Sequence, residues 1–489
     1  MSDEVAERLD SGGVNALRIE ENGINVIAEN ERRGLPRELF WPWFGANVSV
    51  LGLSYGSFVL GFGISFVQAV VVGLIGIVFS FWLCGVIATA GKRGSAPTMV
   101  LSRAAYGVRG NRLPSAISWL LCVGWETALT VIAVLATSTV FTRIGWSGGT
   151  TVKIVAMLII AGLIIAGGVM GFDLIMRMQA VITVVTGLLT IVFIALTFKH
   201  ISWHAVSHVH SGSFELTIGA LVFVMTGFGL GWVNVAADYS RYLPRGASSR
   251  AVVWWTTFGA AIAPIVLLFF GLLLAGSSSS LSSAVGDNPV GALANLLPTW
   301  FLVPFVIVAI LGLVGGAVLD IYSSGLALLS AGLKIPRYAA AGVDGVIMLV
   351  GTIYLVFINK NFLGQFEGFL ITIGVLIAAW CGVFLGDLLL RRKNYVDADL
   401  FRSNGRYGDL RLIPIAITLL SSVLGLGLVT NSAASWLSWQ GYLLGPLGLG
   451  GKSGNWAYAN LGVLVALALS FLLTLLFTRV DVAREESLV

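Results

Sequence analysis

Two acidic residues stand in the middle of long apolar stretches, where an ionisable side chain is unusual. Glu126 follows Trp125 near the centre of one stretch, and Asp320 lies within another. Placing a charge at the centre of a bilayer costs about 3 kcal/mol on insertion scales, so each carboxyl group is a functional candidate. Withdrawal from water favours the neutral carboxyl group, and either residue can therefore exchange a proton and couple it to another event. The competing interpretation is a hydrogen-bonded structural carboxyl group that never titrates.

Three aromatic residues lie at membrane depth, away from the interface where tryptophan usually collects. They are Trp125, Trp232 and Phe228. Aromatic faces hold a flat heteroaromatic ligand well, so these residues predict a binding site for a planar ring. Ordinary packing in the core or against lipid is the alternative.

Phe228 and Trp232 belong to a segment with three alternate glycines, Gly227, Gly229 and Gly231. A helix in lipid gains nothing from so many glycines unless its backbone must open, or must let another helix or a ligand come close. The segment therefore predicts a broken helix that forms a site. Close packing of helices in lipid is the alternative explanation.

The same stretch ends with Asp238 and Arg241, three residues apart. Opposite charges at this spacing lie one helical turn apart and stabilise a helix. Their place near one end of the span predicts a gate or an anchor at the inner end rather than a coupling site.

The composition indicates that membrane helices position these residues. The 489 residues are 57% hydrophobic and 11% charged, with a mean hydropathy of +0.91, whereas soluble domains carry about a quarter charged residues. The net charge of +5 is explained by lysine and arginine at the membrane surface, so nucleic acid is not an expected partner. No phosphate-binding Gly-x-x-x-x-Gly-Lys motif occurs, and the three cysteines indicate neither disulfides nor a metal site.

Charged, proline-rich and serine-rich breaks divide the chain into twelve apolar stretches, and crossing the hydrocarbon core requires about 20 residues. The predicted spans are 40–66, 67–90, 113–142, 152–171, 174–198, 217–242, 251–277, 301–331, 338–358, 362–390, 411–434 and 457–479. With the amino terminus inside, the outer side keeps only five basic residues, Arg143, Lys153, Lys199, Lys360 and Lys452. The positive-inside tendency therefore predicts a multi-pass cell-membrane protein with both termini in the cytoplasm.

Spans one and six are both rich in glycine, and interrupted segments at matching places in two halves indicate an inverted repeat with a site at the midplane. Five plus five spans of opposite topology leave spans eleven and twelve outside the repeat. The predicted division is a cytoplasmic tail (1–36), a first five-helix repeat (37–200), a second repeat (201–390), a cytoplasmic loop (391–410), two additional spans (411–479) and a cytoplasmic tail (480–489).

Several motifs carry a resemblance to a known family. The most specific is the run from Ala236 to Pro244, Ala-Ala-Asp-Tyr-Ser-Arg-Tyr-Leu-Pro. Further support comes from Trp43 with Asn47, Gly124-Trp125-Glu126, Gly231-Trp232, Tyr322 to Leu326, Arg392 to Tyr395, and Gly405-Arg406-Tyr407. From about Gly34 to Arg479 the chain resembles the nucleobase:cation symporter-1 family, the purine-cytosine permeases.

The resemblance implies an all-α, leucine-transporter-type fold, alternating access, and uptake of a nucleobase or related ring with a proton or a sodium ion. In the family the ligand stacks on a span-three tryptophan, which matches Trp125, and on an aromatic group of span six, which Trp232 or Phe228 matches. Polar contacts come from spans one, three and eight. The further residues assigned to the site on this basis are Asn47, Ser54, Asp320 and Gly231.

Two departures from the family pattern bear on the cargo and the cation. Relatives often carry Asn or Gln one turn after the span-three tryptophan, where this chain has Leu129, and the loss weakens hydrogen-bonded recognition of a base. Sodium-coupled relatives offer span-eight hydroxyl groups where this chain has Leu313 and Val314. We therefore expect a proton as the coupling ion, carried by Asp320 or Glu126, with sodium as the alternative.

The expected cargo is a nucleobase, with allantoin, a hydantoin or a pyridine-type vitamin as the alternative. The expected partners are this small heterocycle and the lipid bilayer, with no cofactor besides the cation, no metal site and no obligatory protein partner. An enzyme or receptor without transport is disfavoured, because no nucleophile–base set is visible within the spans.

Overall fold

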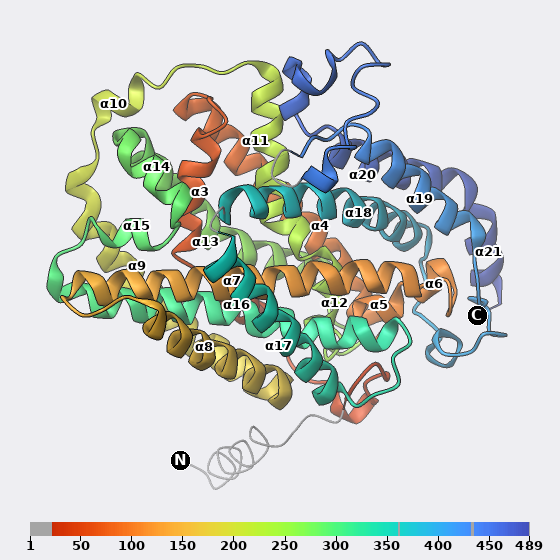
Figure 1. Cartoon of the computed structure of the whole chain (residues 1–489). Coiled ribbons are helices and arrows are strands. Elements are labelled where there is room, and N and C mark those ends of the chain that lie inside the picture. Colours follow the sequence, from red (N-terminus) through yellow and green to blue (C-terminus); the bar gives the residue numbers. More distant parts are fainter. Residues whose placement is uncertain (1–21, 360–361, 432–434, 489) are drawn as a thin grey trace, which may run out of the picture.

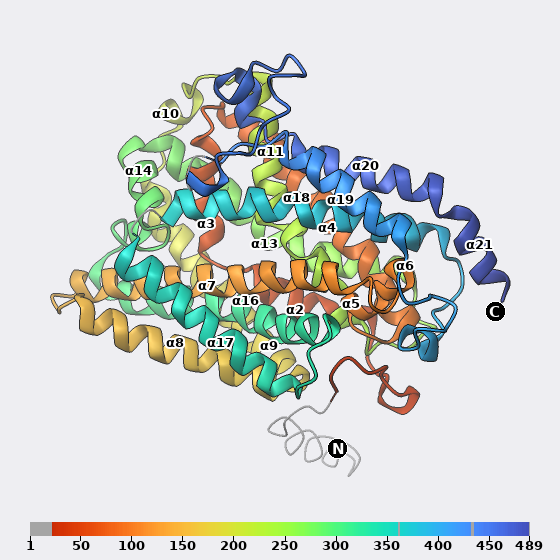
Figure 2. The same ribbon diagram turned by 45° about the vertical axis from the view of Figure 1, so that its right-hand side comes forward.

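The computed structural model describes residues 22–359, 362–431 and 435–488, and the regular structure in these ranges is entirely helical. Figure 1 shows the long helices side by side in one bundle. The short helices α5 (Thr98–Leu101) and α6 (Arg103–Tyr106) lie at one end with α21 (Arg479–Ser487), while α10 (Trp203–Ser207) and α14 (Ser279–Asp287) lie at the other (Figure 1 and Figure 2). We call the first the arginine-rich end, because several arginines donate to backbone carbonyls there, among them Arg103, Arg391, Arg406 and Arg411.

Every predicted span contains a helix. By length and composition, nine helical segments of the described chain can cross a membrane, or up to eleven if each bent pair is one span. The unbroken ones are α4 (Phe66–Gly94), α7 (Arg112–Arg143), α8 (Thr150–Met170), α9 (Phe172–Thr197), α13 (Ser249–Ser277), α16 (Leu302–Ser330), α17 (Arg337–Ile353) and α18 (Phe362–Leu390). The eleventh predicted span contains the shorter helix α19 (Leu412–Leu426), and the twelfth contains α20 (Gly462–Phe477). The prediction of an all-α membrane protein is confirmed.

Two spans are broken where the sequence predicts it. In span one, α2 (Phe40–Asn47) and α3 (Leu51–Leu60) meet at an angle of 64°. In span six, α11 (Phe214–Gly227) ends at Phe228, which takes φ −118° and ψ −109°. Two 3-10 turns then lead to α12 (Ala236–Ser240). Both breaks expose backbone groups that a regular helix would satisfy.

The helix contacts repeat with an offset of five spans. Span one packs against span seven (α13), while span six packs against span two (α4). Spans two and seven pack against each other, and so do spans three (α7) and eight (α16). Exchanging each span of the first half with its counterpart in the second half leaves these contacts unchanged, as an inverted repeat requires.

Candidate functional site

A small cavity lies where the two broken helices meet α7 and α16. Its volume is about 50 Å³, which leaves room for a few water molecules at most. The lining residues are Ala46, Asn47, Ser49, Leu51, Gly52, Tyr55, Trp125, Leu129, Gly227, Phe228, Trp232, Gly312 and Gly316. The structure thus brings together four of the predicted site residues, Asn47, Trp125, Phe228 and Trp232.

Aromatic rings form the walls of this cavity. The Trp125 ring stands edge-on to Phe366, with centroids 5.3 Å apart and planes at 82°. The Phe228 ring packs on the Tyr55 ring with centroids 4.5 Å apart. The Trp232 ring stands edge-on to the Trp43 ring with centroids 5.8 Å apart. Each wall is therefore held in place by a neighbouring ring.

Side chains of neighbouring helices hold the break in span six open. Tyr55 donates its hydroxyl hydrogen to the Gly227 carbonyl at 3.2 Å, and the Gly229 amide donates to Ser80 Oγ at 3.1 Å. A Cβ at Gly229 would overlap the backbone of α4, so only glycine permits this approach. Part of the alternate-glycine pattern thus has a direct structural cause.

The polar groups of the cavity are few. The indole Nε1 of Trp125 is buried and has no hydrogen-bond partner among the described residues. Asn47 Nδ2 donates to the Trp43 carbonyl at 2.8 Å, and Ser49 Oγ accepts from the Leu51 amide at 3.3 Å. None of the described residues that line the cavity is charged. A neutral ring with hydrogen-bond acceptors at its edge suits this lining, because a charged ligand would be buried without a counter-charge.

Two predicted site residues lie beside the cavity without lining it. Ser54 is buried, and its hydroxyl group donates to the Pro289 carbonyl at 2.5 Å. Pro289 lies in the connection between α14 and α15 (Gly291–Ala294). Ser54 therefore anchors α3 rather than facing a ligand. Gly231 lies behind the Trp125 ring, where an added Cβ would sit 3.1 Å from Nε1. Its contribution is the space that the indole ring occupies.

Glu126 and Asp320 also lie outside the lining. Glu126 is fully buried, and its two carboxylate oxygens have no hydrogen-bond partner in the described structure. One turn further along α7, Thr130 Oγ1 lies 3.2 Å from Met348 Sδ of α17, so this face of α7 is directed toward α16 and α17 rather than the cavity. Asp320 lies one turn of α16 after the lining residue Gly316, and its Oδ2 has no hydrogen-bond partner among the described residues. Asp320 thus adjoins the cavity on the side of the arginine-rich end, whereas Glu126 lies at the level of the cavity, between the lining residues Trp125 and Leu129 of α7.

Asp344 of α17 belongs to the same acidic group and is absent from the sequence-based prediction. The signal was available, since Asp344 is one of six acidic residues within the predicted spans. Trp119 Nε1 donates to its Oδ1 at 2.6 Å, and Ser324 Oγ donates to its Oδ2 at 2.8 Å. The two donors fix Asp344 between α7, α16 and α17, in contrast to Glu126.

Asp238 and Arg241 lie at the arginine-rich end and have separate hydrogen-bond partners. Asp238 accepts hydrogen bonds from the amide and the hydroxyl group of Thr98 at 2.7 and 2.8 Å. Arg241 is fully buried and donates to the Gly23 carbonyl and to the Tyr322 hydroxyl, both at 2.8 Å. These bonds tie α12 to α5, to the amino-terminal segment and to α16. Each side chain of the predicted i,i+3 pair thus bonds outside its own helix.

Ion pairs connect the helices at the arginine-rich end. Arg391 Nε lies 2.7 Å from Asp387 Oδ2, and its Nη2 lies 2.8 Å from Glu485 Oε2, which holds α21 against α18. Burial lowers the pKa of the Arg103 guanidinium to about 10, and the nearby charge of Arg112 acts in the same direction. Arg103 therefore remains charged at neutral pH.

We expect Arg241→Ala to open the arginine-rich end, because hydrogen bonds to a charged group contribute about 1.5–3 kcal/mol each. Cys122 reports the opening, since it is buried between the cavity and this end, with Asn234 Nδ2 3.4 Å from its sulfur. Its labelling by a water-soluble maleimide should accelerate at least about tenfold. Arg245→Ala, which removes an ion pair to Asp397 at the same end, is the control. Equal labelling in the two variants would contradict the gate.

Comparison with known proteins places the chain among permeases. Residues 26–445 match the family model described as permease for cytosine/purines, uracil, thiamine, allantoin. The chain belongs to this family. "Putative purine-cytosine permease YxlA" of Bacillus subtilis (strain 168) is 25% identical over 444 residues, which cover 88% of this chain and 91% of that protein. "Purine-cytosine permease FCY2" of Saccharomyces cerevisiae is 27% identical over 248 residues, 47% of this chain and 43% of that protein.

Solved transporter structures share the fold of this permease. Mhp1, a nucleobase-cation-symport-1 family transporter, superposes in a closed conformation with bromovinylhydantoin bound, with a TM-score of 0.70 and 17% identity over 96% of this chain and all of Mhp1. The inward-facing conformation of Mhp1 superposes with a TM-score of 0.66 and 17% identity, over 96% of this chain and 98% of Mhp1. A Na⁺-coupled sialic acid symporter superposes with a TM-score of 0.54 and 13% identity, over 97% of this chain and 96% of the symporter. The leucine-transporter-type fold is confirmed, and the family makes this permease a secondary transporter rather than an enzyme.

Proposed function

We propose that this permease imports a neutral nucleobase of the cytosine or purine type together with a proton, by alternating access. The observation that carries the proposal is the uncharged cavity at the junction of the two broken helices, with Trp125, Phe228 and Trp232 as its walls. A planar heterocycle gains stacking on these rings. The positive-inside tendency puts the arginine-rich end and both termini in the cytoplasm.

The lining also supports a second cargo. Leu129 lines the cavity at the place where relatives often carry an amide side chain, so the wall offers fewer hydrogen bonds to the edge of a base. A ring that needs fewer such bonds, such as allantoin, a hydantoin or a pyridine-type vitamin, is the alternative. The hydantoin bound to Mhp1 belongs to a protein of the same fold and favours the same alternative.

A proton is the proposed coupling ion, and sodium is the alternative. A buried carboxyl group without a donor or a cation is stable in its neutral form, and it ionises when water reaches it. Among the described residues, no donor reaches either carboxylate oxygen of Glu126 or Oδ2 of Asp320. Sodium, a hard cation, requires several oxygen ligands, whereas the turn of α16 facing span one consists of Gly312 to Gly316 without a hydroxyl group. The Gly315 carbonyl there already accepts a hydrogen bond from Gln179 Nε2 at 2.7 Å.

Alternating access requires an opening on each side of the cavity. A pocket of about 570 Å³ lies toward the α14 end, and Phe58 of α3 and Glu367 of α18 are among its lining residues. Tyr55, one turn before Phe58, lines the cavity itself. In the proposed cycle α3 moves to admit the ring from this pocket, and release of the Arg241 bonds then opens the opposite end.

Thermal unfolding of the purified protein with a ligand panel tests the cargo. A bound ligand stabilises the native state by RT ln(1 + [L]/Kd), about 2.7 kcal/mol at 100 Kd. We expect cytosine or a purine to raise the unfolding temperature, whereas allantoin, hydantoins and pyridine-type vitamins leave it unchanged. Stabilisation by the second group alone would transfer the assignment to the alternative cargo.

A further inference from the structure

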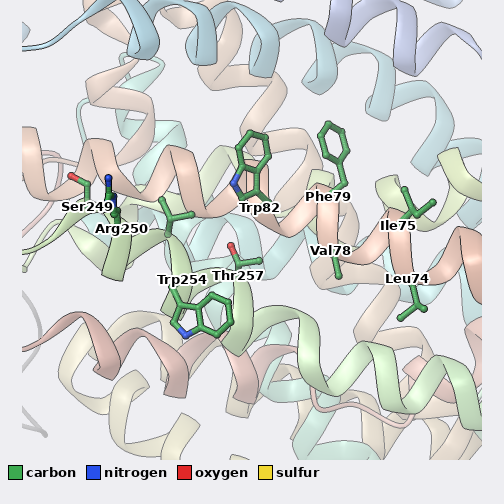
Figure 3. A pocket seen from close by; sticks show the side chains of 10 residues that line it. Leu74, Ile75, Val78, Phe79, Trp82, Ser249, Arg250, Trp254 and Thr257 are labelled. Carbon is green, nitrogen blue, oxygen red and sulfur yellow. The ribbon is translucent and has the colours of Figure 1, made fainter.

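A groove lies on the outer surface of the pair formed by α4 and α13, away from the cavity. Its volume is about 850 Å³, and its lining consists of Leu74, Ile75, Val78, Phe79, Trp82, Ser249, Arg250, Val253, Trp254 and Thr257 (Figure 3). Trp82 and Trp254 are 46% and 62% exposed. Both helices span the membrane, so this apolar groove opens toward lipid.

The groove has a polar end and an apolar end. Figure 3 shows Ser249 and Arg250 at one end, and Leu74 and Ile75 at the other. Ser249 and Arg250 form the first turn of α13, so their end of the groove lies toward the arginine-rich end of the bundle. Arg250 is exposed, and it is the one charged residue among the described residues that line the groove. The lining therefore matches a molecule with an anionic head and a long apolar tail.

We propose that this groove binds one phospholipid with an anionic headgroup. An acyl chain lies along α4 and α13 between Trp82 and Trp254, and the headgroup phosphate pairs with the Arg250 guanidinium. Trp254 lies near the start of α13, where tryptophan at headgroup level is favourable, and a basic residue such as Arg250 is favourable at an anionic leaflet. The proposal depends only on the membrane location of α4 and α13, not on the cargo.

The groove floor connects such a lipid to both broken helices. Thr257 Oγ1 donates to the Phe81 carbonyl at 3.3 Å, and a Cβ at Gly85 would lie 2.8 Å from the Val253 carbonyl oxygen. α4 packs against α11 and α12, while α13 packs against α2 and α3. A lipid seated over this contact braces the helix pair that carries both halves of the cavity, and its binding raises the unfolding temperature.

Native mass spectrometry of the full-length protein in detergent tests the proposal. The probes are phosphatidylglycerol and phosphatidylcholine with the same acyl chains. We expect the wild type to retain one phosphatidylglycerol in preference to phosphatidylcholine. Arg250→Gln should weaken phosphatidylglycerol binding about fivefold, the contribution of one basic residue near an anionic surface. Arg177→Gln, at an exposed arginine of α9 outside the groove, should leave binding unchanged.

A second variant and a competition experiment complete the test of the lipid site. Trp254→Ala should weaken binding of both lipids, since it removes one wall of the groove, and inorganic phosphate should not displace the bound phosphatidylglycerol. Equal phosphatidylglycerol binding by the wild type and Arg250→Gln would overturn the proposal. Displacement by phosphate alone would also overturn it, because the site would then recognise a free anion rather than a lipid.

Discussion

Replacing Trp125 by alanine is expected to reduce substrate uptake at least about 30-fold in protein that still inserts and folds. The Trp125 ring forms one wall of the cavity, and its Nε1 is a buried donor without a partner in the described structure. Stacking of a base on an aromatic ring contributes about 1–3 kcal/mol, and a hydrogen bond adds about 1 kcal/mol. Each 1.4 kcal/mol of lost binding free energy corresponds to a tenfold lower affinity. Uptake of labelled substrate into proteoliposomes measures the loss.

Two variants separate the stacking from the hydrogen bond and from folding. Trp125→Phe keeps a ring but loses the N–H group, so we expect a loss of about fivefold. Trp436→Ala removes an indole that is 75% exposed and outside the cavity, and uptake should remain at the wild-type level. Wild-type uptake by folded Trp125→Ala would exclude Trp125 from the site.

Asp320→Asn is expected to abolish proton-driven accumulation and to leave substrate exchange intact. A pH difference of about 2 units supports about 100-fold accumulation when one proton moves with each neutral substrate, because each unit is a factor of ten. Asparagine resembles the neutral carboxyl group and cannot release a proton, so the variant should equilibrate substrate without concentrating it. Parallel counterflow and pH-gradient uptake in the same proteoliposomes measure the two activities.

Neighbouring acids test whether this effect belongs to Asp320. Asp344→Asn changes a carboxyl group that Trp119 and Ser324 already satisfy, and it should retain accumulation. Loss of accumulation in Glu126→Gln alone would transfer the role to Glu126, the other predicted carrier. Full accumulation by Asp320→Asn would contradict the proposed coupling.

Much of the fold follows from the sequence, because a backbone in lipid must satisfy its own hydrogen bonds and therefore forms helices. Each predicted span contains a helix for this reason. The helices α14 and α15 were not predicted, since the serine-rich stretch around them is too short and too polar to span. They are fixed by distant contacts, such as Asn288 Nδ2 to Thr139 Oγ1 at 2.7 Å and the Ser54 hydroxyl to Pro289.

Residue type and membrane depth predicted the walls of the candidate site, whereas the rotation of each helix decided the rest. Trp125 lines the cavity, and Glu126, the next residue, faces α16 and α17 because successive helical residues point about 100° apart. Ser54 faces α14 for the same reason. The contact of Asp344 with Ser324 joins two spans, and no local pattern in either span indicates it.

Uptake of labelled cytosine into proteoliposomes, with a proton gradient and a sodium gradient imposed separately, tests the central claim most directly. The proposed function predicts that cytosine accumulates when the outside is acidic and sodium is absent. With a sodium gradient alone, cytosine should equilibrate across the membrane without accumulating. Accumulation driven by sodium alone would contradict proton coupling. Absence of uptake for cytosine, purines and uracil in folded protein would contradict the nucleobase assignment.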